Sequence, residues 1–147
     1  MKRRHWLYSV FVVALLSGLL FSAPGAPKPV LATLGWVGGM YPAGGSNTTI
    51  TVGGTFDVYV QVYKAGVTDS AGQGAGIACY LQWAAVPYWG GDWTNITHTS
   101  MTYNTDIGNN DEYKATISPA VGLYEFTAYC TDITDNTTRY QGNGNGK

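Results

Sequence analysis

The chain has 147 residues, of which 45% are hydrophobic and 12% are charged, and its formal net charge is −1. This length holds one hydrophobic core but not two. Every acidic residue lies at or beyond Asp57, whereas four basic residues lie before residue 30, so the chain after its N-terminal segment is acidic. An acidic domain has no basic patch to displace counterions from phosphate, which excludes nucleic acid as a partner.

The N-terminal segment has the layout of a secretory signal peptide. Basic residues at 2–4 precede an apolar run at 6–21, and small residues follow. The apolar run is shorter than the roughly 20 residues of a membrane-spanning helix. The segment therefore predicts export rather than a membrane anchor.

The cleavage site divides the chain into two parts. The small residues at 30–32 predict cleavage before Thr33, with 23–25 as a second candidate site and an uncleaved anchor as the alternative. We assign residues 1–32 to the signal peptide and residues 33–147 to a single domain. We expect a secreted, extracellular protein with no membrane contact after cleavage.

The two cysteines of the chain are expected to form a disulfide. Export takes Cys79 and Cys130 through an oxidising compartment, where such pairs persist. Because Cys130 would be consumed by this bond, no cysteine nucleophile remains.

Alternation of apolar and polar residues predicts strands and no helix. Residues 55–63 show the clearest period of two, and Gly53-Gly54 before them suits a tight turn. Trp36 is expected to pack on the core from an edge strand or lead-in segment. The expected strands are 34–41, 48–52, 55–63, 77–83, 94–103, 110–118, 123–131 and 137–140, with loops at 64–76 and 87–92 and a turn at 104–110.

Short strands separated by regular turns are typical of an antiparallel β-sandwich. Gly122-x-Tyr124 opens a strand that ends in Cys130, which is typical of the immunoglobulin-like or fibronectin type III-like fold. If the two cysteines face each other on neighbouring antiparallel strands, Leu81 lies opposite Ala128. That register lies within one sheet, unlike the disulfide of antibody domains, and it also pairs Trp83 with Phe126, Tyr80 with Tyr129 and Gln82 with Thr127.

This register predicts an aromatic platform on the outer face of the sheet. Tyr80 and Tyr129 would be adjacent, flanked by Gln82 and Thr127, with Arg139 or Tyr140 on the next strand. A flat surface of this kind can stack on sugar rings. The alternatives are an ordinary cross-strand aromatic pair and a face covered by a neighbouring domain.

A second aromatic group lies in the loop after residue 85. Tyr88, Trp89 and Trp93 occur in a glycine-rich stretch, where exposed tryptophans indicate a contact surface. The alternative is a loop that folds back over the end of the sandwich as a plug.

No catalytic or metal-binding constellation appears. His98 is the only histidine after the signal peptide, so no histidine metal site is expected. The acidic residues at 106–112, Asp132 and Asp135 are interpreted as solvated turn residues, because their spacing does not match a twelve-residue calcium loop. No two carboxylates are placed across a cleft for glycoside hydrolysis.

Two stretches resemble a known family. Residues 58–77 and 109–117 are similar to an immunoglobulin-like module near the start of secreted bacterial multi-modular proteins, including amylase and pullulanase-type glycoside hydrolases. Gly91-Asp92-Trp93-Thr94 and the Asn/Gly-rich end also resemble starch-binding immunoglobulin-like modules. That resemblance implies binding roles for Trp89, Trp93 and Tyr140.

The sequence thus predicts a non-catalytic module that binds carbohydrate, or that is accessory to an extracellular polysaccharide-acting enzyme. Its expected partner is a glucan or another cell-surface molecule. The alternative is a structural or interaction subunit that uses exposed strand edges. Whether the chain acts alone or belongs to a larger enzyme is left open.

Overall fold

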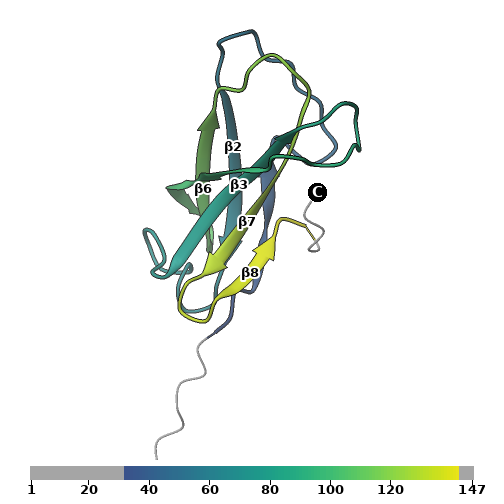
Figure 1. Cartoon of the computed structure of the whole chain (residues 1–147). Coiled ribbons are helices and arrows are strands. Elements are labelled where there is room, and N and C mark those ends of the chain that lie inside the picture. Colours follow the sequence, from purple (N-terminus) through teal and green to yellow (C-terminus); the bar gives the residue numbers. More distant parts are fainter. Residues whose placement is uncertain (1–31, 143–147) are drawn as a thin grey trace, which may run out of the picture. The chain divides into compact units, whose positions relative to one another are not determined.

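The computed structural model describes residues 32–142, and this part of the chain is all β, as the sequence predicts (Figure 1). The predicted signal peptide at 1–32 lies outside the described residues except for its last position. Within the described range no helix is long and apolar enough to cross a membrane.

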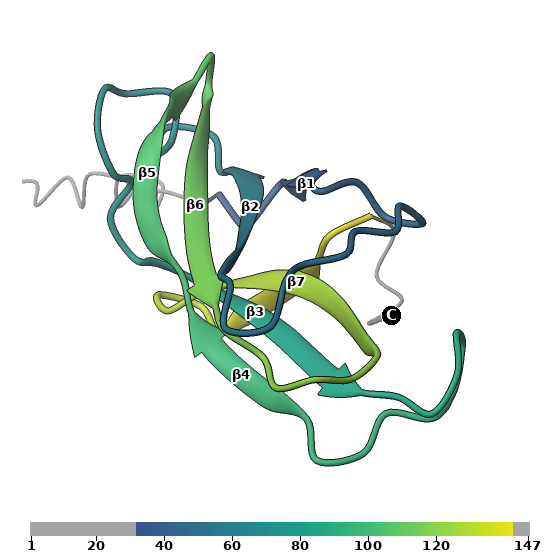
Figure 2. The ribbon, with the colours of Figure 1, turned by 90° about the horizontal axis from the view of Figure 1, so that it is seen from above.

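The strands form two four-stranded antiparallel sheets that pack face to face (Figures 1 and 2). Sheet A has the order β1-β2-β6-β5 and sheet B the order β4-β3-β7-β8. The strands are β1 (Trp36–Tyr41), β2 (Phe56–Tyr63), β3 (Ile77–Ala85), β4 (Thr97–Ser100), β5 (Thr102–Ile107), β6 (Asn110–Ile117), β7 (Tyr124–Asp132) and β8 (Thr137–Tyr140).

Alternation along β2 and its neighbours builds the core between the sheets. Val58, Val60 and Val62 are fully buried, because side chains two residues apart point to the same face of a strand. Leu81 and Tyr113 pack in the same cluster from β3 and β6. The alternation predicted for this strand from the sequence therefore matches the alternation of its buried side chains.

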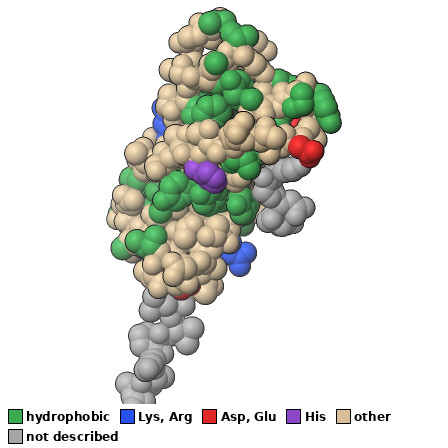
Figure 3. Space-filling view, in the orientation of Figure 1, with side chains coloured by type: hydrophobic (Ala, Val, Ile, Leu, Met, Phe, Trp, Pro, Cys, Tyr) green, Lys and Arg blue, Asp and Glu red, His purple; other side chains and the backbone are tan. Residues whose placement is uncertain are grey.

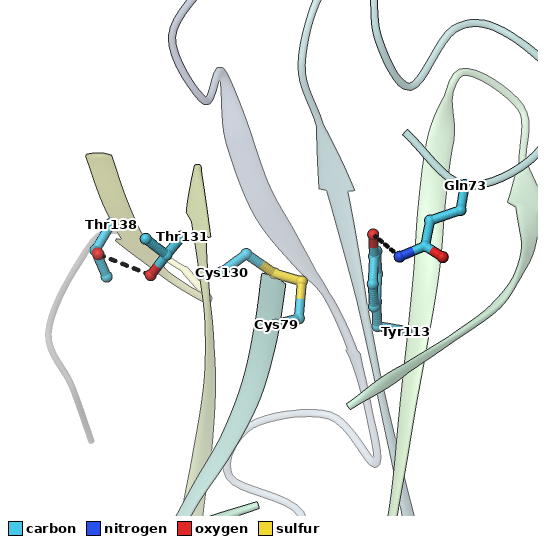
Figure 4. Close-up of a disulfide and its surroundings, with 6 residues drawn as sticks. All are labelled: Gln73, Cys79, Tyr113, Cys130, Thr131 and Thr138. Atoms are coloured by element: carbon cyan, nitrogen blue, oxygen red, sulfur yellow. Dashed lines mark hydrogen bonds between the residues drawn. A yellow bond between two sulfur atoms is a disulfide. The ribbon is translucent and has the colours of Figure 1, made fainter. Parts of the chain in front are cut away.

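The predicted pairing of β3 with β7 is confirmed. Cys79 lies opposite Cys130, and Tyr80 lies opposite Tyr129. The two cysteines form a disulfide within sheet B, and Figure 4 shows it between the strands that carry it. Because one strand position fixes the whole ladder, this pair sets the outward and inward faces of sheet B.

Three local predictions are wrong. Residues 48–52 form part of a loop and not a strand. Trp36 does not pack on the core, because Val37 takes the inward position of β1 and Trp36 is 42% exposed. The predicted strand 94–103 and turn 104–110 are two strands, β4 and β5, joined at Met101.

The crossing at Met101 moves the chain from sheet B to sheet A. β4 pairs with β3, whereas β5 pairs with β6, and the backbone N–H of Met101 donates to the carbonyl of Cys79. Met101 itself is buried. One buried apolar residue in a mostly polar stretch thus anchors the switch between the two sheets, and the sequence pattern of this stretch predicts a single weak strand.

The loops gather at two ends of the sandwich. We call the end with the loops 64–76, 108–109 and 133–136 the closed end. We call the end with the loops 42–55, 86–96 and 118–123 the open end, which lies at the top of Figure 1 and faces the viewer in Figure 2.

A buried ion pair joins the two sheets at the closed end. Lys64 follows β2 and Asp132 ends β7, with 2.5 Å between Nζ and Oδ2 and 3% and 0% of the side chains exposed. Burial opposes ionisation, but hydrogen bonds from Lys64 and Thr134 outweigh it and lower the pKa of Asp132. The interpretation of Asp132 as a solvated turn residue is therefore wrong.

A second buried carboxylate anchors the 64–76 loop. Asp111 is fully buried and accepts a 2.7 Å hydrogen bond from the backbone N–H of Gly74. Burial raises the pKa of Asp111. Asp106, opposite Asp111 on β5, accepts hydrogen bonds from the hydroxyl of Tyr103 and the backbone N–H of Gly72, and both lower the pKa of Asp106. The bond to Asp106 also raises the pKa of Tyr103 to about 12. Asp111 is thus a structural group and not a solvated one.

Candidate functional site

A cleft of about 640 Å³ opens among the loops of the open end. We call it the tryptophan cleft, because Trp83, Trp89 and Trp93 all line it. Its other walls come from residues 43–52 and 119–123. A volume of this size is within the range of ordinary small-ligand sites, roughly 300–1,000 Å³.

The floor of the cleft is a cluster of aromatic rings at the edge of the core. Phe56 of β2 meets Phe126 of β7 edge to face, with ring centroids 5.2 Å apart. Trp83 lies 5.5 Å from Tyr124 and donates its indole N–H to the hydroxyl of Thr99 at 3.0 Å. These contacts hold the rings in fixed positions, so the floor is a preformed surface.

Glu125 attaches the 86–96 loop, which carries Trp89 and Trp93, to strand β7. Its Oε2 accepts a 2.7 Å hydrogen bond from the indole N–H of Trp93, and its Oε1 accepts one from the backbone N–H of Gly90. Gly90 has φ +77°, a backbone conformation that other residues rarely adopt. One carboxylate therefore fixes both the turn of the loop and the orientation of Trp93.

The two loop tryptophans differ in exposure. Trp89 is 55% exposed and Tyr88 is 65% exposed, whereas Trp93 is half-buried. The loop therefore does not fold back as a plug over Trp89. The exposed indole of Trp89 and the indole of Trp93, which is hydrogen-bonded to Glu125, together form a wall of the cleft that a ligand can reach.

The outer face of sheet B carries the predicted tyrosines. Tyr80 and Tyr129 stack at 5.3 Å with their planes 22° apart, and Tyr140 follows at 5.2 Å. We call these three residues the tyrosine row. The Tyr140 ring is tilted by 40° from the Tyr129 ring, so the three rings do not lie in one flat platform.

His98 joins the tyrosine row from β4, which the sequence did not predict. Its Nδ1 lies 3.0 Å from the Tyr129 hydroxyl, and its ring meets the Tyr129 ring edge to face. Figure 3 shows a histidine beside hydrophobic side chains on this face. Burial, followed by the neighbouring Tyr140 and Tyr80, raises the pKa of Tyr129. The polar flanks proposed for the platform are absent from the surface, because Gln82 and Thr127 are buried.

The five candidate binding residues therefore divide into two groups. Trp89 and Trp93 line the tryptophan cleft, while Tyr80, Tyr129 and Tyr140 do not. The sequence missed Trp83 and Glu125 as parts of the cleft. The alternation of β7 places Glu125 on the outer face, but only the folded 86–96 loop shows what it contacts.

The chemistry that the cleft can perform is limited by its side chains. Glu125 is the one charged side chain among the described residues that line it, and both of its oxygens accept hydrogen bonds from the loop. Within residues 32–142 no three His, Cys, Asp or Glu side chains gather in a way that could hold a metal ion. The cleft thus offers a ligand aromatic rings together with uncharged polar side chains, which are Ser46, Asn47, Thr48, Thr49, Thr51 and Gln141.

The chain shows partial similarity to two curated proteins. It is 29% identical over 114 residues to an amylopullulanase of Thermoanaerobacterium thermosulfurigenes, covering 67% of this chain and 6% of the relative. It is 30% identical over 98 residues to an amylopullulanase of Thermoanaerobacterium saccharolyticum, covering 57% of this chain and 8% of the relative. The chain thus spans less than a tenth of either protein. No family model matches it, and no solved structure matches it.

Proposed function

We propose that this chain is a secreted, non-catalytic module that binds glucan in the tryptophan cleft and is accessory to a polysaccharide-acting enzyme. The observation that carries the proposal is the exposed indole of Trp89 at the mouth of an aromatic cleft. The C–H faces of a pyranose ring are apolar, so they pack on aromatic rings while the hydroxyls remain in water.

The similarity to two amylopullulanases supports the polysaccharide as ligand class. The matched region is a small part of each relative, which fits a module and not a whole enzyme. Secretion is supported by the basic and apolar N-terminal segment and by the Cys79–Cys130 disulfide, which persists in oxidising compartments.

A non-catalytic role is supported by how the cleft uses its carboxylate. Hydrolysis of a glycosidic bond normally needs two carboxylates that flank the bond. Glu125 is the single charged residue among the described lining residues, and it holds the 86–96 loop. The cleft therefore suits binding better than bond cleavage.

A titration of tryptophan fluorescence tests the proposal. The oxidised domain is titrated with soluble starch and with maltoheptaose, beside Trp89→Ala and Trp93→Ala. We expect saturable binding that weakens about 10-fold or more in each variant, as for a central aromatic contact. Ile133→Ala is the control, because Ile133 is 64% exposed at the closed end. No response of the wild-type domain to any glucan would contradict the proposal.

A second candidate function is an extracellular interaction subunit. Its support is that β1, β5, β4 and β8 each end a sheet and pair on one side only. Such edges can add a strand from another chain. A strictly monomeric profile at high concentration, with glucan binding present, would exclude self-assembly as the function.

A further inference from the structure

A second groove lies between the two sheets, along the side formed by their edge strands β1 and β8. It has a volume of about 440 Å³ and is lined by Trp36 and Val37 of β1 and by residues 137–140 and 142 at β8. We call it the edge groove. β1 ends sheet A and β8 ends sheet B, so the groove runs between two strand edges.

The indole of Trp36 lies over Gly38. A Cβ atom on Gly38 would collide with Cζ2 and Cε2 of that ring, so the ring rests on a position without a side chain. Trp36 is nevertheless 42% exposed. One face of the indole is thus supported by the strand, and much of the ring remains open to a ligand.

Arg139 supplies the polar counterpart. It lies opposite Cys130 in the β7–β8 ladder, one position away from the outward-facing Tyr140, and it lines the edge groove. The backbone of Arg139 belongs to the β7–β8 ladder, but its guanidinium forms no ion pair and no hydrogen bond to any other residue between 32 and 142. The planar fork of a guanidinium can donate to two neighbouring hydroxyl oxygens at once.

The edge groove adjoins the tryptophan cleft. Gln141 lines the cleft, and its two chain neighbours, Tyr140 and Gly142, line the groove. Across from them, β1 runs from Trp36 in the groove to Met40 in the cleft. The edge groove and the tryptophan cleft therefore lie next to each other, and both are lined by β1 and by the end of β8 with the residues after it.

We propose that the edge groove is a second sugar-binding site, in which a pyranose ring lies on Trp36 while Arg139 donates to its hydroxyls. The groove and the tryptophan cleft then bind successive stretches of one glucan chain. This inference rests on the proposed function, because it takes the same class of ligand. It adds that the preferred ligand is a long chain, since only a long chain can occupy both sites.

Binding to two linked sites predicts a specific dependence on chain length. The second contact on one polymer is intramolecular, so it strengthens overall binding without any new surface. Maltotriose is too short to gain from this and binds the two sites independently. We expect two binding sites for maltotriose, and an affinity for soluble starch at least about 10-fold higher.

Calorimetry with the wild-type chain, three variants of the edge groove and the cleft variant Trp89→Ala tests the inference. Trp36→Ala removes the indole, Arg139→Gln removes the guanidinium, and Gly38→Ala keeps Trp36 but displaces it. Gly38 has no positive φ, so its backbone accepts alanine, and thermal unfolding of each variant checks that the fold is retained. Ile133→Ala is again the control. We expect Trp36→Ala and Gly38→Ala to lose one maltotriose site and about 10-fold in starch affinity, with a smaller loss for Arg139→Gln.

The outcomes separate this inference from the proposed function. If Trp36→Ala and Gly38→Ala bind starch as tightly as wild type while Trp89→Ala does not, the edge groove is not a site and the cleft is retained. If only the Trp36 and Gly38 variants lose binding, the groove binds sugar and the tryptophan cleft is wrong. If wild type binds neither maltotriose nor starch, both proposals are wrong.

Discussion

The two ends of the sandwich differ in what their loops bury. At the closed end, Lys64, Asp111 and Asp132 are almost completely buried and are held by ion pairing or hydrogen bonds. At the open end, Val52, Tyr88, Trp89 and Val121 are 84%, 65%, 55% and 81% exposed around the tryptophan cleft. Charged groups are buried at the closed end, whereas large apolar side chains are exposed around the cleft at the open end.

From this difference we assign stability to the closed end and, in line with the proposed function, binding to the open end. Buried charges are costly unless they are paired, so the buried charged residues of the closed end tolerate little change. Exposed apolar side chains around a cleft contribute little to folding and mark a contact surface. Substitutions of the buried charged residues at the closed end should therefore destabilise the domain, and substitutions at the open end should remove binding from a folded domain.

The largest effect is expected from breaking the buried ion pair. Lys64→Met leaves Asp132 buried without its partner, which costs about 3–5 kcal/mol of unfolding free energy. Urea denaturation measures the loss. The double variant Lys64→Met/Asp132→Leu replaces both charges by apolar groups and should recover most of it. A loss below about 1 kcal/mol in the single variant would contradict a structural role for the pair.

Removal of the disulfide should have an effect of similar size. Cys79 and Cys130 are 51 residues apart, and a closed loop of this size contributes about 4 kcal/mol in the chain-entropy model. The double variant Cys79→Ala/Cys130→Ala, compared by urea denaturation with wild type, measures it. If the double variant and wild type unfold at the same urea concentration, the disulfide is not what holds β3 to β7.

A smaller effect is expected at the open end, from Glu125. Glu125→Ala removes the acceptor for Trp93 and Gly90, and hydrogen bonds to a charged group contribute about 1.5–3 kcal/mol when lost. The domain should remain folded, while acrylamide quenches its tryptophan fluorescence more strongly and glucan binding weakens. Glu125→Gln keeps one acceptor oxygen and should lie between the two. Unchanged quenching in Glu125→Ala would mean that Glu125 does not order the loop.

The smallest effect is a change in the pH dependence of stability. The pKa of Asp132 is lowered in the folded state, so its contribution is present above about pH 4 and is lost as pH falls. The raised pKa of Asp111 acts in the opposite direction, because its ionised form is disfavoured by burial. Urea denaturation of Asp132→Asn between pH 3 and 7 should give a shallower acid slope than wild type. Asp92→Asn is the control, because Asp92 is exposed in the 86–96 loop. An equal slope in wild type and Asp132→Asn would contradict this role.

Much of the fold could be predicted because the alternation of apolar and polar residues follows directly from strand geometry. Side chains two apart share a face, so one pair of cysteines was enough to fix the whole β3–β7 register. The burial of Asp111 and Asp132 could not be predicted in this way. Their partners, Gly74 and Lys64, are 37 and 68 residues away, and a carboxylate in a turn-like sequence is usually solvated.

The candidate site could be predicted only in part. The tryptophans were recognised from their residue type and their loop, but their arrangement depends on Glu125, 32 residues beyond Trp93. The tyrosine row lies where the register places it, but its rings stack or tilt against one another and do not share one plane. The sequence predicts Trp36 in the core because large apolar residues are usually buried. In the structure its ring packs over Gly38, outside the core.

Mapping of backbone amide shifts on titration with maltoheptaose tests the central claim most directly. We predict saturable shifts at the open-end loops 42–55, 86–96 and 118–123, with the closed-end loops 64–76 and 133–136 unchanged. Shifts confined to the closed end, or none anywhere at saturating sugar, would contradict the account that the two ends divide binding from stability.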